Sequence, residues 1–425
     1  MLFFWRLLWY DETMKIAGIT AEYNPFHKGH RYHIEKTREA LEADCIIAVM
    51  SGNFTQRGEA AVMDKWTRSR IATEEGVDLV VELPFLYACN RAEFFAQGAV
   101  DILQSLGVSH ISFGSESGDL EALQALAKDM VRHRETLAED RMHFMKKGFS
   151  FAKSLQLASE HIFGTARTKL MAEPNNILAL EYLKRMVYWR EQGHPMKAVT
   201  VKRYGSGYFE KNGASGYAGA SAIRRMIEHD AAGTKNYVPE SVHAKLAAAH
   251  VPAAMEKEMF RLLRYELIRS PHEELSEIYC MGEGLENKLK KEIVSADSMQ
   301  RFLSVMVSKR YTEATIRRLL LYVLLGVKGS DPLGKPYARV LAAGEKGRKL
   351  LRHLKKEKDL SIPIITNINK DGQAVLEAGK MLEYDCLASD FYNLISGRSL
   401  YRFSDKVMHP YIKGEHVGLQ YMCYN

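Results

Sequence analysis

The 425-residue chain is poor in cysteine and proline, with 5 Cys and 11 Pro. The cysteines are widely scattered and lack the Cys-x-x-Cys spacing of metal fingers: Cys45, Cys89, Cys280, Cys386 and Cys423. An odd and sparse set excludes a disulfide framework and is typical of thiols kept reduced in the cytosol, so a cytoplasmic protein is predicted. With 46% hydrophobic and 26% charged residues, the composition also excludes a collagen-like or mainly disordered chain.

No stretch is apolar over the roughly 20 residues that span a bilayer. The most apolar stretch, residues 1–10, is short, is interrupted by Arg6 and is not followed by the small-residue cleavage site of a signal peptide. Because Met14 directly precedes a predicted strand, we interpret residues 1–13 as an N-terminal extension from an upstream start codon. A packing arm and a membrane-surface anchor are the alternatives. No membrane and no protein partner are otherwise implied.

The segment from residue 15 to residue 116 alternates between short apolar runs, rich in Val and Ile, and amphipathic stretches. Strands are predicted at residues 15–23, 44–51, 78–84 and 110–116. Helices are predicted between them at residues 31–43, 65–76 and 94–107. The alternation predicts an α/β fold with a Rossmann-like parallel sheet, in which ligands bind at the carboxyl ends of the strands.

The rest of the chain is mostly helical in pattern. Residues 119–190 predict helices, a fifth strand is predicted at 196–204, and the glycine-rich stretch 205–219 predicts a mobile loop. Beyond about residue 237 helical patterns dominate, apart from a predicted strand at 360–369. We therefore expect a first domain at residues 14–240 and a mainly α-helical domain at residues 241–425.

The loop between the first strand and the first helix, with the sequence EYNPFHKGH, carries the strongest chemical signal. Pro25 ends the strand, Gly29 permits a close turn, and His30 falls at the helix N-terminus, where free N–H groups favour an anion. His27 and His30 can donate hydrogen bonds to phosphate oxygens and stabilise negative charge that develops during attack at phosphorus. We predict both as catalytic residues. The alternative is a loop and cap pair without chemistry.

Several stretches carry a wider resemblance: GITAEYNPFHKGHRYH, VMSGNFTQRGEAAVMDKWTRSRIA, VDLVVELPF, ISFGSESGD, PNNILALEY, SKRYTEATIRRLL and PIITN. Together they closely resemble the tRNA(Met) cytidine acetate ligase family of the HxGH nucleotidyltransferase superfamily. The resemblance covers most of the chain from Met14. It implies a ligase in which acetate attacks the α-phosphate of ATP, releasing pyrophosphate. The acetyl-adenylate then acetylates the wobble cytidine of elongator tRNA(Met), giving N4-acetylcytidine and AMP.

The resemblance, together with the strand ends, implies an ATP site, and Mg²⁺ is expected to accompany ATP. The candidate ATP-binding residues are Thr20, Ala21, Glu22, Tyr23, Asn24, Pro25, Phe26, His27, Lys28, Gly29, His30, His33, Gly114, Ser115, Asn175, Asn176, Lys202, Arg203 and Ser221. The family usually has Asn where Ser117 stands and often Gly where Ala179 stands. A simple turn at the fourth strand, an N-cap at Asn175 or Asn176, and solvated charges at the fifth strand are the alternatives.

Two further segments are candidates for binding acetate or phosphate. After the second strand, Asn53, Gln56 and Arg57 are expected to orient one of these anions, and Arg57 is the best carboxylate clamp because guanidinium binds in a bidentate manner. The alternative is a polar loop without a chemical role. ASAIR at residues 220–224 resembles a shortened S-x-x-I-R motif, which predicts Ser221 as a helix cap and Arg224 as a catalytic residue at the triphosphate.

A metal site is not predicted. Zinc ligation that included His33 would need a carboxylate–histidine spacing that the sequence does not supply.

Positive charge is concentrated in the second half of the chain. Residues 301–359 contain 15 lysines and arginines and 5 acidic residues, a net charge of +10, whereas the whole chain carries +7. Such a segment favours a polyanionic partner, and Tyr311, Tyr322 and Tyr337 are expected to offer surfaces on which unpaired bases stack. A solvated helix face is the alternative. The candidate tRNA-binding residues are Lys309, Arg310, Tyr311, Arg317 and Arg318.

Two other classes of function fit part of the sequence. A nucleotidyltransferase acting on a small phosphorylated coenzyme precursor would use the same histidine loop, but it leaves the basic helical half unexplained. A non-catalytic RNA-binding protein would explain the basic half, but His27, Gly29 and His30 argue against it because the phosphate-binding signature is intact.

Overall fold

The computed structural model describes residues 14–203, 217–229, 231–246, 252–331, 333–356 and 361–415. Within these residues, eight strands form one sheet in the order β5-β4-β1-β2-β3-β6-β7, and β8 pairs with β6. The first five strands are parallel: β1 (Ile16–Ala21), β2 (Cys45–Ser51), β3 (Leu79–Leu83), β4 (His110–Ser115) and β5 (Lys197–Lys202). The predicted α/β fold and its five strands are confirmed, with ends that differ by one or two residues.

The strand order places a crevice beside β1. The chain runs outward from β1 through β2 to β3 and then returns to form β4 on the other side of β1. Connections at the carboxyl ends of β1 and β4 therefore diverge, which is where open parallel sheets bind ligands. The histidine loop follows β1 directly.

Side chains alternate along the strands between two cores. Ile46 and Ala48 of β2 face the core formed with α1, α2, α11 and α12, whereas Ile47 and Val49 face the core formed with α4, α9 and helices of the second half. This period of two, with every residue of β2 buried, is what a strand covered by helices on both faces requires.

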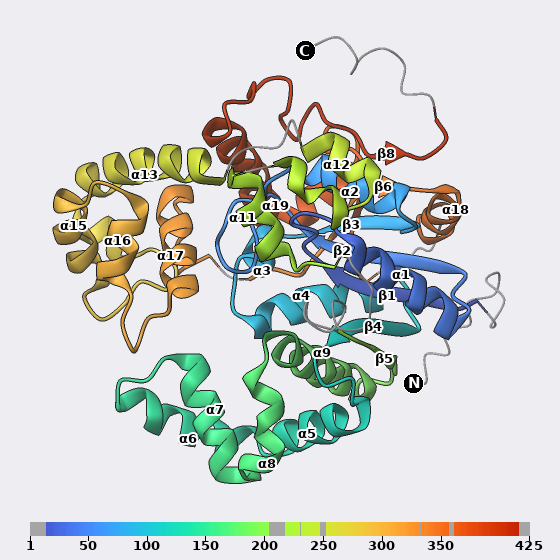
Figure 1. Ribbon diagram of the computed structural model, residues 1–425, viewed down its shortest axis with the longest axis horizontal. Helices are drawn as coiled ribbons and strands as arrows, with labels where there is room; N and C mark the ends of the chain where they lie inside the picture. Colours follow the sequence, from blue (N-terminus) through green and yellow to red (C-terminus); the bar gives the residue numbers. More distant parts are fainter. Residues whose placement is uncertain are drawn as a thin grey trace.

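Helices surround the sheet and extend from it in two groups (Figure 1). The helices of the first half are α1 (Lys28–Leu41), α2 (Lys65–Glu74), α3 (Phe85–Ala88), α4 (Ala92–Ser105), α5 (Leu120–Arg132), α6 (Arg134–Lys146), α7 (Phe151–Phe163), α8 (Thr165–Thr168), η1 (Lys169–Ala172), α9 (Pro174–Glu191), α11 (Ala220–His229), η2 (Ala231–Asn236) and α12 (Glu240–Leu246). Figure 1 shows that α5–α8 form an arm at the bottom of the molecule.

The second half contributes a helical module and returns to the sheet. Its helices are α13 (Pro252–Arg269), α14 (His272–Ser276), α15 (Leu285–Ser295), α16 (Met299–Met306), α17 (Glu313–Leu325), α18 (Glu345–Leu354) and α19 (Gly372–Ile395). Its strands are β6 (Ala338–Ala343), β7 (Ile364–Ile365) and β8 (Tyr411–Ile412). We refer to α13–α17 as the helical module, which lies at the left of Figure 1. No helix among the described residues has the length and apolar character needed to cross a membrane.

Strand β6 is the main element that the sequence did not predict. It is fully buried and pairs antiparallel with β3, so the second half contributes to the same sheet as the first. Its sequence, ARVLAA, combines alanine and leucine with few β-branched residues, which favours a helix unless tertiary packing decides otherwise. The strand predicted at 360–369 is only the two-residue β7. The predicted boundary at residue 240 stays a prediction.

Two predicted features lie outside the described residues: the N-terminal extension at 1–13 and residues 205–216 of the predicted mobile loop.

A buried ionic cluster ties the C-terminal segment to the sheet. Lys65 Nζ lies 2.7 Å from Glu82 Oε1 and 2.7 Å from Asp405 Oδ2, and Arg339 also pairs with Asp405. All four side chains are at most 3% exposed. Burial alone would raise the pKa of Asp405, but Arg339 and Lys65 hold that pKa below its ordinary value.

Replacing Asp405 by Ala should destabilise the fold by about 3–5 kcal/mol, because Lys65 and Arg339 would share one remaining carboxylate in a buried site. Urea denaturation measures this change. The control is Glu42→Ala, which removes an exposed pair with Lys15 and should cost less than about 1 kcal/mol. Equal effects of the two substitutions would show that the cluster does not hold the C-terminal segment.

Candidate active site

The loop between β1 and α1 stacks two imidazole rings at the start of a helix. His27 is the N-cap of α1, and its backbone N–H donates to His30 Nδ1 at 3.2 Å. The two ring centroids are 3.7 Å apart, with 20° between the planes. A Cβ at Gly29 would lie 2.9 Å from His27 Cε1, so only glycine leaves room for this ring.

Burial keeps the histidines of this loop neutral. Burial, together with the nearby charge of Arg203, lowers the pKa of His27 to about 3 and that of His33 to about 4. The pKa of His30 is also lowered, first by burial and then by His27 and Arg203. A neutral imidazole donates a single hydrogen bond, so positive charge toward a phosphate must come from other groups.

The ring nitrogen Nδ1 of His27 is a candidate to bind a ligand. The side chain is 4% exposed, and within the described part of the chain Nδ1 is buried without a hydrogen-bond partner. Buried polar atoms are rarely left unpaired, which fits a nitrogen that bonds a bound nucleotide.

A cavity of about 80 Å³ opens beside the two rings. It is lined by His27, Gly29, His30, Tyr32, His33, Gly114, Val201, Lys202, Arg203, Tyr217, Ala218 and Gly219. Seven of the predicted site residues meet here, from the start of α1 and the ends of β4 and β5. A Cβ at Gly114 would lie 2.9 Å from the Arg203 side chain, so glycine lets that side chain cross the strand end. Arg203 and Lys202 supply positive charge.

Five lining residues were not predicted from the sequence: Tyr32, Val201, Tyr217, Ala218 and Gly219. Tyr32 and Val201 adjoin residues that were predicted, so their position next to the motif was the available signal. Tyr217 to Gly219 immediately precede α11, and only the folded chain brings that helix start to the histidines.

Other predicted ATP-binding residues hold the strand ends in place. Asn176 Oδ1 accepts from the backbone N–H groups of Glu116 and Ser117 at 3.1 and 3.2 Å, and Asn175 donates to Glu116. Ser115 Oγ accepts from Gly118 N at 3.1 Å. The predicted N-cap at Asn175 or Asn176 is wrong, because α9 begins at Pro174 with Glu173 as its N-cap.

The rest of the histidine loop is also fixed by hydrogen bonds. Asn24 Oδ1 accepts from Val62 N at 2.9 Å, and Lys28 Nζ donates to the Asn236 carbonyl at 2.7 Å. His33 Nε2 lies 3.0 Å from Ser112 Oγ on β4. These contacts orient the loop without filling the cavity.

Arg224 lies between the histidine loop and the loop after β2. Its Nη1 donates to the Asn24 carbonyl at 2.9 Å, and its Nη2 lies 3.2 Å from Glu59 Oε2. The predicted cap at Ser221 is wrong, because α11 begins at Ala220. The backbone N–H groups of its first turn donate to the Gly219 carbonyl and not to the Ser221 side chain. Ser221 Oγ instead accepts from Arg224 at 3.3 Å.

Of the three residues predicted to orient an anion, only Arg57 is exposed. Asn53 is buried, and its Oδ1 accepts from Lys65 N at 2.7 Å. Gln56 donates its backbone N–H to Glu22 at 2.7 Å and its side-chain amide to a carbonyl of Asn90 at 2.8 Å. Burial raises the pKa of Glu22, partly offset by this backbone hydrogen bond. Asn53 and Gln56 therefore shape the loop, and neither lines the cavity beside the histidines.

The candidate tRNA-binding residues fall into two groups. Lys309, Arg310 and Tyr311 form the turn between α16 and α17; Arg310 pairs with Glu283, and Tyr311 donates to the same carboxylate at 2.6 Å. Lys309 Nζ lies 3.7 Å from the ring centroid of Phe149, between α6 and α7 in the arm formed by α5–α8.

Arg317 and Arg318 are held by protein groups. Arg317 pairs with Glu256 and Glu313, and Arg318 is 8% exposed with Nη1 donating to the Gln56 carbonyl. Arg318 thus positions the loop after β2 and does not face solvent. Tyr322 and Tyr337 are buried, so the expectation that they offer stacking surfaces is wrong. Both hydroxyl groups donate to buried groups of the protein, Tyr322 to the Cys89 carbonyl and Tyr337 to the Asp385 carboxylate.

A metal cage is not apparent in the described residues, where no three His, Cys, Asp or Glu side chains come together in a metal-binding arrangement.

Comparison with known proteins places the chain in a family. A family model described as HIGH Nucleotidyl Transferase matches residues 14–405. A tRNA(Met) cytidine acetate ligase of Thermoanaerobacter sp. (strain X514) is 40% identical over 416 residues, covering 94% of this chain and 100% of that protein. A protein of the same name from Caldicellulosiruptor saccharolyticus is 36% identical over 388 residues, covering 90% and 94%.

Solved structures give the same result. The crystal structure of Thermotoga maritima TmcAL bound with alpha-thio ATP has a TM-score of 0.82 and 30% identity, covering 94% of this chain and 99% of that chain. An apo structure of the same protein matches equally well, with a TM-score of 0.82. The likeness extends over the sheet and the helical second half.

Replacing His27 by Asn should flatten the dependence of stability on pH. Because the pKa of His27 is about 3 in the folded protein and about 6.5 when unfolded, the unfolded state binds the proton first as pH falls. Stability therefore decreases as pH falls from 6.5 toward 3, and this residue accounts for about 1.4 kcal/mol per pH unit. Urea denaturation between pH 4 and 6 measures the slope. An unchanged slope in the variant would contradict a buried neutral imidazole.

Proposed function

Because the chain belongs to the HIGH nucleotidyl transferase family and, within it, to the tRNA(Met) cytidine acetate ligases, we propose that it uses ATP to acetylate the wobble cytidine of elongator tRNA(Met). The products are N4-acetylcytidine, AMP and pyrophosphate. One observation supports the proposal that His27 and His30 act on ATP. Their rings stack beside a cavity at the crevice between β1 and β4.

The first step forms acetyl-adenylate. An acetate oxygen attacks the α-phosphorus of ATP, and the bond to the bridging oxygen of pyrophosphate breaks. Neutral His27 and His30 each donate one hydrogen bond to the phosphate oxygens, and the positive N-terminal end of the α1 dipole adds to this stabilisation. Lys202 and Arg203, at the end of β5, offset the charge of the triphosphate.

The second step transfers the acetyl group. The exocyclic amine of the cytidine attacks the acetyl carbonyl, AMP leaves, and the amine loses a proton. The anticodon loop is single-stranded, so its bases can be presented without opening a duplex. We assign tRNA contacts to the turn at Lys309, Arg310 and Tyr311, which lies on the helical module.

Mg²⁺ accompanies ATP in this proposal and is held through the triphosphate, since Mg²⁺ keeps several waters and binds substrate phosphates readily. A tRNA substrate also places the reaction in the cytoplasm.

The proposal is tested by incubating the protein with ATP and radiolabelled acetate, with and without bulk tRNA. Label should enter tRNA only when ATP is present, and digestion should release it as N4-acetylcytidine. Nucleotide transfer to a small phosphate ester without tRNA would instead identify a coenzyme-type nucleotidyltransferase. If neither product forms, the remaining alternative is a non-catalytic RNA-binding protein.

Replacing His30 by Ala should lower acetate-dependent AMP formation at least about 100-fold, because one donor to the developing charge is lost. Binding of tRNA, measured by filter retention, should be unchanged. The control is His272→Ala, a change at an exposed histidine on α14. Near-normal turnover of the His30 variant would contradict the role of this imidazole.

Replacing Arg310 by Ala should weaken tRNA binding and reduce the slope of log K against log salt concentration by about one, because one phosphate contact is lost. Acetate-dependent ATP–pyrophosphate exchange should persist. Arg132→Ala, on the exposed face of α5, is the matched control. If the Arg310 variant keeps the wild-type salt slope, the turn does not contact the tRNA backbone.

A further inference from the structure

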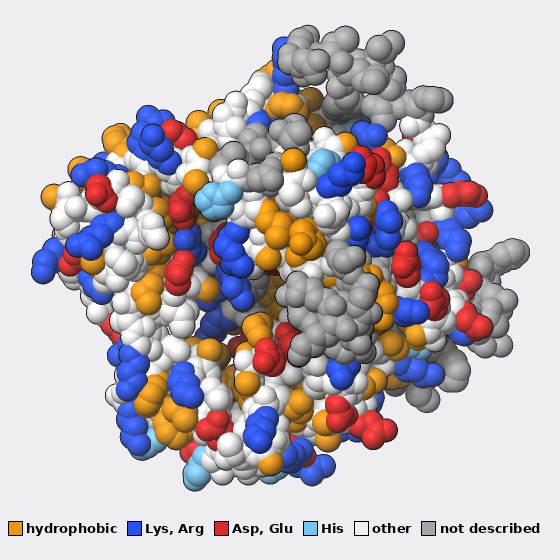
Figure 2. Space-filling view, viewed as in Figure 1, with side chains coloured by type: hydrophobic (Ala, Val, Ile, Leu, Met, Phe, Trp, Pro, Cys, Tyr) orange, Lys and Arg blue, Asp and Glu red, His pale blue; other side chains and the backbone are white. Residues whose placement is uncertain are grey.

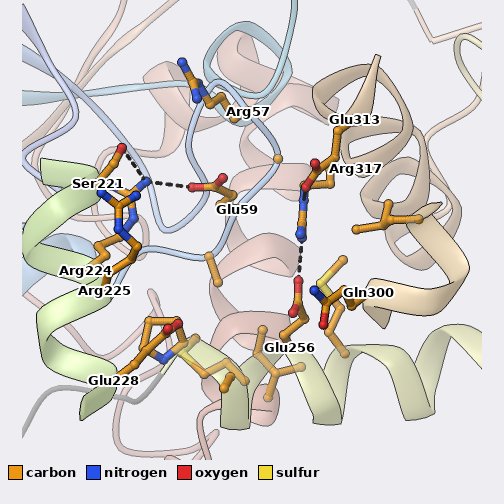
Figure 3. Close-up of a pocket in the computed structure, with 18 of the residues that line it drawn as sticks. Arg57, Glu59, Ser221, Arg224, Arg225, Glu228, Glu256, Gln300, Glu313 and Arg317 are labelled. Carbon is orange, nitrogen blue, oxygen red and sulfur yellow. Dashed lines mark hydrogen bonds and ion pairs between the residues drawn. The ribbon is translucent and has the colours of Figure 1, made fainter. Parts of the chain in front are cut away.

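A second, larger cavity separates the sheet from the helical module. Its volume is about 890 Å³, within the roughly 300–1,000 Å³ that small ligands occupy. Its walls come from the loop after β2, from α11 and from α13, α16 and α17 of the helical module (Figure 3). Figure 2 shows a hollow near the centre of the molecule with Lys and Arg side chains along its border. We call this cavity the interdomain cleft.

The charges of the interdomain cleft are balanced, but two arginines stay available. Arg224 pairs with Glu59, and Arg317 pairs with Glu256 and Glu313. The remaining charged residues of the lining are Arg57, Arg225 and Glu228, all exposed and without an ion-pair partner among the described residues. In Figure 3 they lie on the loop after β2 and on α11. A lining with equal numbers of arginines and glutamates does not suit a triphosphate, whereas two free arginines suit the phosphodiesters on either side of a nucleotide.

The helical module offers apolar and polar groups to the same space. The apolar lining residues are Pro252, Met255, Met259, Leu303 and Val307. Gln300 and Ser304 lie among them on α16, with hydrogen-bonding groups in reach of the cleft. A nucleobase has apolar faces and polar edges, and Met side chains adapt to flat ring systems.

The interdomain cleft adjoins the histidine site through the start of α11. Gly219 lines the small cavity beside His27, whereas Ser221 and Arg224 line the cleft. Arg224 also donates to the Asn24 carbonyl, three residues before His27. One helical turn therefore separates the two spaces.

We infer that the interdomain cleft is the acceptor site, which holds one unpaired pyrimidine nucleotide of the RNA while its flanking phosphates contact Arg57 and Arg225. This inference rests on the proposed function and adds where the acceptor binds. The base packs on the apolar residues of α13 and α16, Gln300 contacts its polar edge, and its exocyclic amine points past Arg224 toward the acetyl-adenylate. The amine nitrogen forms a bond to the acetyl carbon as the bond to AMP breaks.

Two variants test this site in the full-length protein. Ser304→Trp fills the cleft from α16, and Arg225→Glu reverses one of the free charges. Each should lower kcat/KM for acetyl transfer to an elongator tRNA(Met) transcript by about 30-fold or more, since a blocked base site and a lost phosphate contact each cost roughly 2 kcal/mol. ATP–pyrophosphate exchange with acetate and without tRNA should stay within about twofold, because neither Ser304 nor Arg225 lines the cavity beside the histidines.

Matched controls change bulk and charge elsewhere. Ser276→Trp adds the same ring to an exposed position on α14, and Arg132→Glu reverses an exposed charge on α5. Both controls should retain exchange and transfer. If the cleft variants transfer acetyl at the rates of the controls, or lose exchange and transfer together, the acceptor assignment is wrong. If the wild-type protein catalyses exchange but never labels tRNA, the proposed function is wrong. The acceptor-site inference, which rests on that function, is then wrong as well.

Discussion

The packing of two neutral imidazoles at the first turn of α1 is the constraint on which the rest of the site depends. Gly29 makes it sterically feasible, since any side chain there would displace the His27 ring. Burial makes the rings neutral, so they act as single hydrogen-bond donors and add no charge of their own. In the proposed mechanism, the imidazoles and the positive end of the α1 dipole stabilise the phosphate oxygens, and Arg203 with Lys202 offsets the triphosphate charge.

The helical module is fastened to this site through the loop after β2. Gly58 lies so close to α17 that a Cβ would be 2.7 Å from Arg318 N, and Arg318 donates to the Gln56 carbonyl. Gln56 in turn donates its backbone N–H to Glu22, the first residue of the histidine loop. A single loop therefore contacts both the histidine loop and the helical module. This arrangement suits an enzyme whose two half-reactions must meet at one acyl group.

The sequence was sufficient for the elements that have a strong local signal. The strands β1 to β5 are runs of apolar residues between turn formers, and the histidine motif lies between a strand and a helix, so both were predictable. Strand β6 was missed because its alanine-rich sequence has no strand preference of its own and is held in place by β3. Residues such as Asn53 and Arg318 were predicted as ligand contacts because a polar side chain in a motif gives no sign of whether it faces a cavity or a buried backbone group.

A crystal structure of the protein with a non-hydrolysable ATP analogue tests the central claim most directly. The account predicts that phosphate oxygens lie within hydrogen-bond distance of the His27 and His30 ring nitrogens, at the crevice between β1 and β4. A nucleotide bound elsewhere, with both rings still packed against each other and free of contact with it, would contradict the account.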